Sequence, residues 1–580
     1  MCGIIGYVGK RKASEVITEG LKRLEYRGYD SVGIAVQNGE TVEVKKEKGM
    51  VEEISTALNF LSVIGNVGLG HTRWATHGVP CKANAHPHSA CDKKVVLAHN
   101  GVIENFSELK KELLAKNHKF DSETDSEVIA HLIEEELKLA ADPKKAFLSA
   151  LNRLHGSYAV VAMIGNDEKI YVARKNSPLV IGVGKGEMFC ASDIPAMLKY
   201  TKTFVLLEEG DVAVLSKNDY IISDLAGDRL NRKTIIVDWN LEMAEKGGYQ
   251  HFMLKEIHDQ KHFVLESLSA DMSKAKQLLS NYQNIDIVAC GTSYHAGRLL
   301  EILLTKELKK HAKAIIASEY QVVANPDDQT LVIVISQSGE TADTLQAVKF
   351  AKKHGAKIIC LTNVVGSSIT RISDEVVYLN AGPEISVAAT KTFTSQLVVI
   401  YKLVFGQKRA LKIQSLIENA LKNEEKIKDV ARKLLDKPNI FFIGRGLNYP
   451  VAMEGALKLK EISYLHAEAY AGGELKHGPL SLIEVGVPVI AIAPSDSTLP
   501  KIFGNIKEVK ARGAYLIAIT DDEKIKQEAD NSIKIEKVDD DYFYPFAEII
   551  SVKLLAYYVS ILRGINPDKP RNLAKSVTVE

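Results

Sequence analysis

The feature that most constrains the fold is a change of hydrophobic pattern near residue 240. Up to about residue 230, short segments alternate apolar and polar residues between glycine-rich turns, as in GIAVQNG and KIYVARK. This pattern predicts an antiparallel sheet domain with a few helices, among them 13–27 and 126–139. From about residue 250, fully apolar strands alternate with longer helices, which predicts parallel βαβ units. The chain therefore combines an α+β part and an α/β part.

The second half of the chain also repeats itself. IDIVACGTS resembles NIFFIGRGL, and their glycines, Gly291 and Gly444, are 153 residues apart; HGAKIICLTN resembles RGAYLIAITD, with Gly355 and Gly513 158 residues apart. Both pairs of similar segments occur in the same order and are separated by nearly the same number of residues. This favours a duplicated α/β domain over chance similarity. We expect an N-terminal domain over 1–230, a linker over 231–249, α/β domains over 250–408 and 425–563, and a tail over 564–580.

Composition and charge exclude several classes of protein. Lys and Arg (74) balance Asp and Glu (73) at a formal charge of +1, so no global basic field points to nucleic acid. The six cysteines lack the close pairs of a zinc site, a redox dithiol or a disulfide framework. No basic residues precede the first apolar stretch, and the longest apolar runs fall short of the roughly 18 residues that span a bilayer. We expect a soluble cytoplasmic protein that binds neither nucleic acid nor membrane.

Cys2 is the first candidate for chemistry. A cysteine that starts a strand is more often an inert apolar residue. If the initiator Met is removed, however, Cys2 carries both a thiol and a free α-amine, whose pKa near about 7.7–8.0 suits a general base. A nucleophile and its base would then share one residue.

Polar residues gather in the loops that follow the first strands. Arg73 offers a planar fork for a carboxylate, and Asp125 could accept an ammonium group or act as a plain helix N-cap. Asn100 and Gly101 could supply a side-chain amide and a backbone N–H to an oxyanion. Five of the sixteen histidines lie within 29 residues, but they lack metal-site spacing, so we expect no metal there; they are His71, His77, His86, His88 and His99.

In the second half, LVIVISQSGETADTL reads as a buried strand, a Ser/Gly/Thr turn and a helix start. Hydroxyls of Ser336, Ser338 and Thr341 with free backbone N–H groups can bind an anion without a basic residue, although such residues are usually plain caps. No nucleotide-binding fingerprint occurs in the chain.

Three further segments carry candidate residues. Glu454, Lys458 and Glu461 share one face of a helix, a spacing that more often marks a solvated row of ion pairs. Against that reading, Ala452, Ala456, Leu457 and Leu459 make the helix apolar enough that we expect it to be largely buried. A glycine-rich loop follows and carries His477. The C-terminal LAKSVTVE is richer in apolar and β-branched residues than a frayed tail usually is. This composition predicts that the segment around Lys575 docks on the protein.

The motifs MCGIIGYVG, LEYRGYDS, HTRWATHG, NAHPH, HNGVIEN and SETDSE, in this order, resemble those of amidotransferases with an N-terminal nucleophilic cysteine. Together with the second half, they resemble the glutamine–fructose-6-phosphate aminotransferase (isomerising) family over nearly the whole chain. The resemblance implies a four-layer αββα sandwich of the N-terminal-nucleophile type, followed by two parallel-sheet sugar isomerase (SIS) domains.

The resemblance also implies roles for residues. Cys2 attacks the glutamine carboxamide, Arg73 and Asp125 hold its α-carboxylate and α-ammonium, Asn100 and Gly101 form the oxyanion hole, and Trp74 gates the ammonia path. Lys575 forms a Schiff base with fructose 6-phosphate, Glu461 moves a proton between C1 and C2 with help from Lys458, and His477 opens the sugar ring. The glutamine pocket is further lined by Thr76, His77 and His86, and the sugar phosphate is held by Thr292, Ser336, Gln337, Ser338 and Thr341.

The implied enzyme is a homodimer that needs no cofactor or metal, and whose His477 reaches the neighbouring subunit. Ala389 departs from the serine of bacterial members, which removes one hydrogen bond to the sugar. Two other readings stay open: another amidotransferase with the same N-terminal half, and a sugar-phosphate-binding regulator without turnover. SQSGET and the duplication speak against the first, and Cys2, Glu461, His477 and Lys575 together speak against the second.

Overall fold

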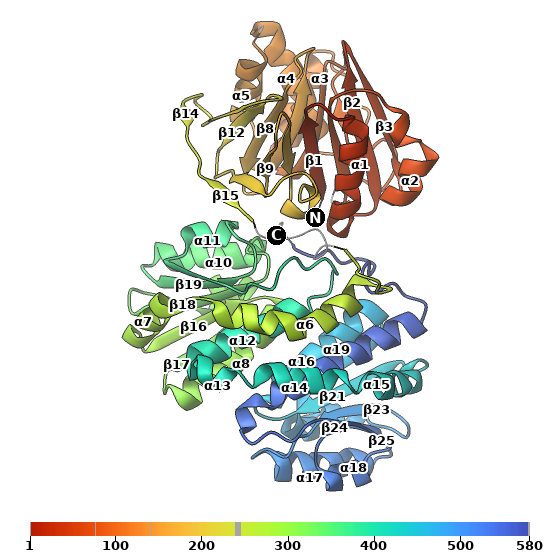
Figure 1. Ribbon diagram of the computed structural model, residues 1–580, viewed down its shortest axis with the longest axis vertical. Coiled ribbons are helices and arrows are strands. Elements are labelled where there is room, and N and C mark those ends of the chain that lie inside the picture. Colours follow the sequence, from red (N-terminus) through yellow and green to blue (C-terminus); the bar gives the residue numbers. More distant parts are fainter. Residues whose placement is uncertain (1, 76, 141, 238–244, 578–580) are drawn as a thin grey trace. The chain divides into compact units, whose positions relative to one another are not determined.

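The computed structural model describes residues 2–75, 77–140, 142–237 and 245–577 (Figure 1). The chain divides into two compact units: unit 1 comprises 1–244 and 574–580, and unit 2 comprises 245–573. The division falls where the hydrophobic pattern of the sequence changes.

Unit 1 contains two antiparallel sheets. The first runs in the order β15 (Thr234–Ile236), β11 (Thr203–Leu206), β9 (Val180–Val183), β10 (Met188–Ala191), β1 (Gly3–Val8), β4 (Val67–Arg73), β2 (Ser31–Asn38), β3 (Thr41–Lys48). The second runs in the order β14 (Arg229–Leu230), β13 (Tyr220–Ser223), β12 (Val212–Leu215), β8 (Ile170–Lys175), β7 (Gly156–Ile164), β6 (Val95–Ile103), β5 (His88–Ser89).

The two sheets of unit 1 lie between two layers of helices, visible in Figure 1. Strand β1 shows why: Ile4 and Val8 pack into the core between the sheets, whereas Ile5 and Tyr7 pack into the core under the helices. Successive side chains of a strand point to opposite faces of the sheet. A strand whose odd and even positions are both apolar therefore needs a packed layer on each face of its sheet. The expected αββα sandwich is confirmed. The covering helices are α1 (Ala13–Leu24) and α2 (Val51–Ala57) on the first sheet, and α3 (Phe106–Ala115), α4 (Glu127–Leu139) and α5 (Pro143–Asn152) on the second.

Two local expectations need correction. The helix expected over 13–27 ends at Leu24 and continues as a 3₁₀ turn, Glu25–Arg27. The segment expected as a linker, 231–249, is not wholly linker, because Thr234–Ile236 pairs with β11 as the edge strand β15. Its Thr-Ile-Ile run is β-branched and suits a strand. Residues 238–244 of that segment lie outside the described residues.

Unit 2 contains two parallel sheets with the same topology. The first has the order β17 (His311–Ile316), β16 (Asn284–Ala289), β18 (Thr330–Ser336), β19 (Lys357–Thr362), β20 (Glu375–Tyr378); the second has the order β22 (His466–Ala471), β21 (Asn439–Gly444), β23 (Pro488–Ile492), β24 (Tyr515–Thr520), β25 (Asn531–Lys534). Matching strands carry the repeated sequence landmarks, which confirms the duplication.

The helices of unit 2 cover both sheets and enclose one continuous apolar core that both sheets share. Two smaller cores lie on the other faces of the sheets. The helices are α6 (Phe252–Ser269), α7 (Ser273–Asn281), α8 (Gly291–Glu307), α9 (Tyr320–Val323), α10 (Ala342–Lys353), α11 (Ser368–Ile372), α12 (Lys391–Phe405), α13 (Gln407–Ala410), α14 (Ile413–Leu421), α15 (Glu424–Ala431), α16 (Asn448–Ser463), α17 (Leu499–Lys510), α18 (Glu523–Glu528) and α19 (Tyr544–Leu562).

The first and last helices of unit 2 meet. Helix α6 packs against α19, and the backbone N–H groups of Phe252 and Met253 donate to the two carboxylate oxygens of Asp568 at 2.7 and 2.8 Å. His251 Nδ1 lies 3.0 Å from the hydroxyl of Tyr557 on α19. A carboxylate at a helix N-terminus satisfies orphan N–H groups and complements the helix dipole. Asp568 therefore fastens the start of unit 2 to its end.

Helix α19 is also unusually apolar. Within the described residues, the segment 541–562 has the length and hydropathy of a membrane span, a feature that the shorter apolar runs in the sequence did not reveal. In the structure, 89% of its apolar window is buried inside the protein. The segment is the central core helix of unit 2.

Candidate functional site

Cys2 lies directly before β1 and is held from three sides. Its Sγ accepts the Trp74 backbone N–H at 3.2 Å, and its carbonyl oxygen accepts Arg27 Nε at 3.2 Å and Asn100 Nδ2 at 3.0 Å. Burial raises the pKa of the Cys2 thiol, against smaller lowering by the Trp74 backbone N–H, Arg73 and Arg27. A thiol in this state needs a base to become a nucleophile near neutral pH.

Asn100 and Gly101 lie side by side on β6, next to Cys2. Asn100 Nδ2 also donates to Ser192 Oγ at 3.0 Å, and its Oδ1 lies 3.0 Å from His71 Nε2, so the amide orientation is fixed. Gly101 has φ of +131°, and a Cβ there would lie 2.1 Å from the carbonyl oxygen of Ser157. The backbone at this point can therefore be formed only by glycine.

Arg73 ends β4 and is 3% exposed. Its Nη2 donates to the carbonyl oxygens of His77 and of Gly78, the latter at 3.1 Å, whereas its Nη1 is buried without a hydrogen-bond partner among the described residues. A buried guanidinium N–H without a partner is costly, so this atom points to an anionic ligand such as a carboxylate.

Asp125 is buried, and its Oδ2 accepts the Ile103 N–H of β6 at 2.8 Å. It is not the N-cap of α4: that helix begins at Glu127, and Ser126 occupies the cap position without a side-chain cap bond. The carboxylate is thus fixed to the strand that carries Asn100 and Gly101.

The expected pocket residues gather around Arg73. His86 is buried and stacks on His71 with ring centroids 4.1 Å apart, and burial holds the pKa of His86 well below its usual value. The ring of His77 lies 6.0 Å from that of Phe106, and Trp74 packs edge-on against Tyr29 at 5.5 Å. His86 therefore stays neutral near pH 7. Thr76 lies outside the described residues.

Sequence reasoning missed two residues that hold Cys2. Arg27 ion-pairs with Asp193 at 3.2 Å and donates to the Cys2 carbonyl; Ser192 accepts the Ile4 N–H at 2.9 Å and the Asn100 amide. Arg27 stood inside the quoted LEYRGYDS motif, which was the available signal. Ser192 had none, because only the pairing of β1 with β10 brings it there.

In unit 2, the Ser/Gly/Thr turn follows β18 as expected. Ser336 Oγ accepts the Gly339 N–H at 3.1 Å, and Ser338 Oγ accepts the Glu340 N–H at 3.2 Å. Thr341 is the N-cap residue of α10, and Gln337 accepts the Asn363 N–H through its carbonyl at 3.1 Å. Thr292 lies in the first turn of α8, after the neighbouring strand β16. The order β17-β16-β18 places the topological switch point between β16 and β18, where α/β sheets bind ligands.

Helix α16 carries the expected row of charges, but the row is not solvated. Glu454 and Lys458 are fully buried. Glu454 accepts Thr292 Oγ1 at 3.1 Å, contacts His295 Nδ1 at 2.8 Å and lies 3.6 Å from Lys458 Nζ, which also pairs with Glu461. Burial lowers the pKa of Lys458, but the two glutamates outweigh it and raise the pKa overall. The chain of contacts joins Thr292 to Glu461.

The remaining expected residues are His477, Lys575 and Ala389. His477 ends the 3₁₀ segment Gly472–His477, is exposed, and forms no hydrogen bond with the described residues. Lys575 is partly buried and belongs to the segment that clusters with unit 1, whereas the serine turn and Glu461 belong to unit 2. Ala389 is partly buried in the loop before α12.

That loop is tied down by buried charges that sequence reasoning missed. Glu384 accepts the N–H groups of Thr390 and Thr392 at 2.9 and 3.0 Å, and Glu256 accepts the Ile385 N–H at 2.6 Å. Lys553 of α19 donates to the Thr390 carbonyl at 2.7 Å, and burial lowers its pKa to about 7. These contacts fix the loop that contains Ala389 and precedes α12.

Comparison with known proteins agrees with this geometry. Residues 71–199 match the glutamine amidotransferase domain, and residues 278–405 and 433–563 match the SIS domain. The glutamine–fructose-6-phosphate aminotransferases (isomerizing) of Thermococcus kodakarensis and Pyrococcus horikoshii are each 50% identical to the chain, over 603 and 599 residues and 100% of both chains. The solved C-terminal domain of glucosamine-fructose-6-phosphate aminotransferase from Francisella tularensis is 41% identical with a TM-score of 0.52, covering 56% of this chain and 100% of that one.

Half of the residues are thus identical over the full length of curated relatives, and the chain has the glutamine amidotransferase and SIS domains of that family. The chain belongs to the glutamine–fructose-6-phosphate aminotransferase (isomerizing) family.

Proposed function

We propose that this protein converts fructose 6-phosphate and glutamine into glucosamine 6-phosphate and glutamate. The observation that carries the proposal is the presence, in one chain, of a buried thiol beside an unpartnered guanidinium nitrogen and of a hydroxyl-lined turn at a sheet switch point. The first suits an amino-acid carboxamide, and the second suits a sugar phosphate.

In unit 1, Cys2 Sγ attacks the glutamine carboxamide carbon, ammonia leaves, and water hydrolyses the resulting thioester to glutamate. Arg73 Nη1 binds the α-carboxylate and Asp125 binds the α-ammonium, with His77, His86 and Thr76 around them. Asn100 Nδ2 and the Gly101 N–H stabilise the oxyanion, which is typically worth a factor of about 10²–10³ in rate per donor. Trp74, whose N–H already contacts Sγ, gates the ammonia path.

In unit 2, the N–H groups and hydroxyls of the turn hold the phosphate together with Thr292 and Gln337. Lys575 Nζ condenses with the C2 ketone to form a Schiff base and releases water. Ammonia then attacks C2, releases the lysine amine and leaves an unsubstituted imine at C2. Glu461 then removes a proton from C1 and returns it to C2, while Lys458 holds the carboxylate in place. His477 opens the sugar ring. Because it is exposed, we propose that it serves the site of a second subunit in a homodimer.

The decisive experiment supplies the full-length protein with glutamine and fructose 6-phosphate and measures glutamate and hexosamine phosphate together. We expect the two products in equal amounts. Glutamate without hexosamine phosphate would indicate another amidotransferase, and sugar-phosphate binding without either product would indicate a regulator.

The role of Lys575 has its own test. Borohydride added with fructose 6-phosphate should reduce the imine and attach the sugar to this lysine, which peptide mass mapping locates. Lys569→Arg is the matched control and should keep both labelling and synthesis. If Lys575→Arg is equally active, the lysine takes no part in the reaction.

A further inference from the structure

A second cluster of reactive side chains lies in unit 1 and takes no part in the proposed reaction. Cys91 lies in the turn between β5 and β6, His118 follows α3, and His131 and Glu134 lie three residues apart on one face of α4. One ligand atom from each of the four lies within 4.8 Å of the others. Cys91 is at the surface and the other three are buried.

Five of the six spacings among the four atoms suit a tetrahedron around a metal ion, and the sixth, between Cys91 Sγ and the Glu134 carboxylate, is within 4.8 Å. Cys91 Sγ lies 3.8 Å from His118 Nδ1 and 3.6 Å from His131 Nδ1; the two Nδ1 atoms are 3.2 Å apart; and Glu134 Oε2 lies 2.9 and 3.4 Å from them. Ligands bound tetrahedrally to zinc at 2.0–2.3 Å stand about 3.3–3.7 Å apart. The observed distances bracket this range.

The surroundings orient each group toward the centre. His118 Nε2 is within hydrogen-bond distance of Glu135 Oε1 at 2.7 Å. His131 Nε2 faces Glu127 Oε1 at 3.6 Å, which is too long for a hydrogen bond. Carboxylates in this position are the usual partners of metal-bound histidines. Cys91 Sγ accepts the Lys119 N–H at 3.3 Å, which fixes the position of the sulfur.

Glu134 is held in the same way. Its Oε1 accepts the Asp92 N–H at 2.9 Å and its Oε2 lies 3.4 Å from the Cys91 N–H. These two contacts aim the carboxylate at the two histidine Nδ1 atoms.

Protons alone leave this arrangement poorly satisfied. If each histidine carries its proton on the outer nitrogen, both Nδ1 atoms present lone pairs to each other, to Glu134 and to the sulfur. The weak Cys91 S–H is then the donor for three electron-rich acceptors, and a cation satisfies all four atoms at once. We propose that Cys91, His118, His131 and Glu134 bind one Zn²⁺ ion through Sγ, the two Nδ1 atoms and Oε2.

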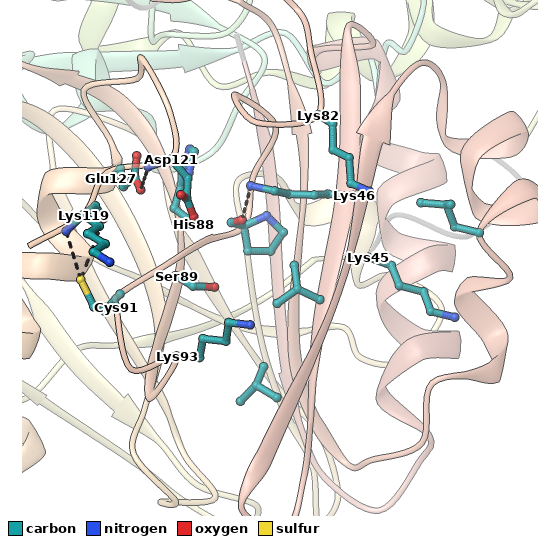
Figure 2. A pocket seen from close by; sticks show the side chains of 15 residues that line it. Lys45, Lys46, Lys82, His88, Ser89, Cys91, Lys93, Lys119, Asp121 and Glu127 are labelled. Atoms are coloured by element: carbon teal, nitrogen blue, oxygen red, sulfur yellow. Dashed lines mark hydrogen bonds between the residues drawn. The ribbon is translucent and has the colours of Figure 1, made fainter.

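All four positions are filled by the protein, so the ion is structural rather than catalytic. It ties the β5–β6 turn and the segment after α3 to α4, whose first turn follows Asp125. Figure 2 shows Cys91 and Lys119 on the wall of a cavity of about 590 Å³, which gives the ion a route from solvent. Sequence reasoning missed this site because its ligands come from three separate segments, and only His131 and Glu134 stand at helical spacing.

The test uses full-length protein freed of any affinity tag and purified without chelator. Elemental analysis should find about one zinc per chain. After removal by a chelator, added Zn²⁺ should restore the melting temperature, and Co²⁺ should give a thiolate-to-cobalt absorption band. Chain without bound zinc whose melting temperature does not respond to Zn²⁺ would overturn the proposal.

Variants assign the ligands. Cys91→Ser, at the surface where folding tolerates it, should lose the cobalt band and most of the zinc affinity, and Glu135→Gln should weaken binding about 10–100-fold as an outer partner. Cys81→Ser and Glu136→Gln are the matched controls and should bind zinc like the parent. If Cys91→Ser keeps the parent's zinc affinity, the site is not the one proposed.

Discussion

Arg73 shows what a single residue contributes to substrate recognition. Replacement by lysine keeps the charge but removes the planar fork that reaches the unpartnered position. A charge-assisted hydrogen bond is worth about 1.5–3 kcal/mol, so Arg73→Lys should raise KM for glutamine about 10–100-fold. Synthesis from added ammonium should be unchanged.

Arg23→Lys is the matched control, since Arg23 lies in the same unit, is partly buried and pairs with Glu19 one turn earlier on α1. It should leave KM for glutamine unaltered. Equal effects of the two substitutions on KM would mean that Arg73 does not contact the substrate.

Gly101 makes a backbone prediction at the same scale. Because a Cβ would lie 2.1 Å from the Ser157 carbonyl, Gly101→Ala must displace β6 or β7. We expect the melting temperature to fall and glutamine hydrolysis to drop at least about 100-fold through loss of an oxyanion donor. Gly165→Ala is the control, since Gly165 also has positive φ (+64°) but open space around it. Similar losses of hydrolysis in both variants would remove the special role of Gly101.

At this scale, the sequence alone predicts residues whose chemistry is unusual for their position, such as Cys2 and Arg73. It does not predict Ser192 or Glu384, because serine and glutamate are common and their partners are set by strand pairing and loop closure. The apolar residues of helix 448–463 do predict that Glu454 and Lys458 are buried. They do not predict which groups pair with each charge, since the helical spacing is the same on a solvated surface.

Among the elements, α19 carries an unusual buried acid. Both carboxylate oxygens of Glu548 are buried without a hydrogen-bond partner among the described residues, and burial, with smaller contributions from Asp496 and Asp521, raises its pKa well above 4.5. The folded state therefore holds the proton more tightly than the unfolded state. The stability from this proton is complete below about pH 4.5 and is lost as pH rises toward the folded pKa.

Glu548→Gln, which cannot ionise, should therefore melt at a higher temperature than the parent at pH 8, with the difference shrinking toward pH 5. Glu424→Gln is the opposite control: contacts with His258 and Tyr558 outweigh burial and lower the Glu424 pKa, so this variant should lose stability at pH 8. Thermal melts at both pH values check the pair. A Glu548→Gln difference that does not change with pH would mean that the acid is ionised in the fold.

The elements themselves could be predicted where their period is regular, as for the helix at 126–139. The edge strand β15 could not, because three β-branched residues beside a charged, glycine-containing stretch look like a linker until β11 pairs with them. The 3₁₀ end of α1 is likewise set by tertiary contacts of Arg27 with Cys2 and Asp193.

For the whole molecule, each unit has its own cores, which predicts separable activities. Cys2→Ala should abolish glutamine hydrolysis while retaining synthesis of glucosamine 6-phosphate from ammonium and conversion of fructose 6-phosphate to glucose 6-phosphate. The three assays on one folded preparation check this, with Cys190→Ala, a buried cysteine away from the reaction, as the control. Loss of all three in the Cys2 variant alone would show that the units do not work independently.

The repeat and the change of pattern predict the number and kind of sheets in the molecule. They do not predict that both sheets of unit 2 share one core. An apolar helix such as α19 has the same sequence pattern whether it packs against one sheet or against two.

The hydrogen bonds between Asp568 and the start of α6 can form only late in synthesis. The amides of Phe252 and Met253 leave the ribosome long before the carboxylate that caps them, some 315 residues later. At about 5–20 residues per second, the interval is on the order of 15–60 s. Throughout it, the apolar face of α6 lacks α19, so unit 1 can fold from the emerging chain while unit 2 stays open. For just over half of its synthesis, the nascent chain therefore exposes an apolar helix face that only the last helix of the protein covers.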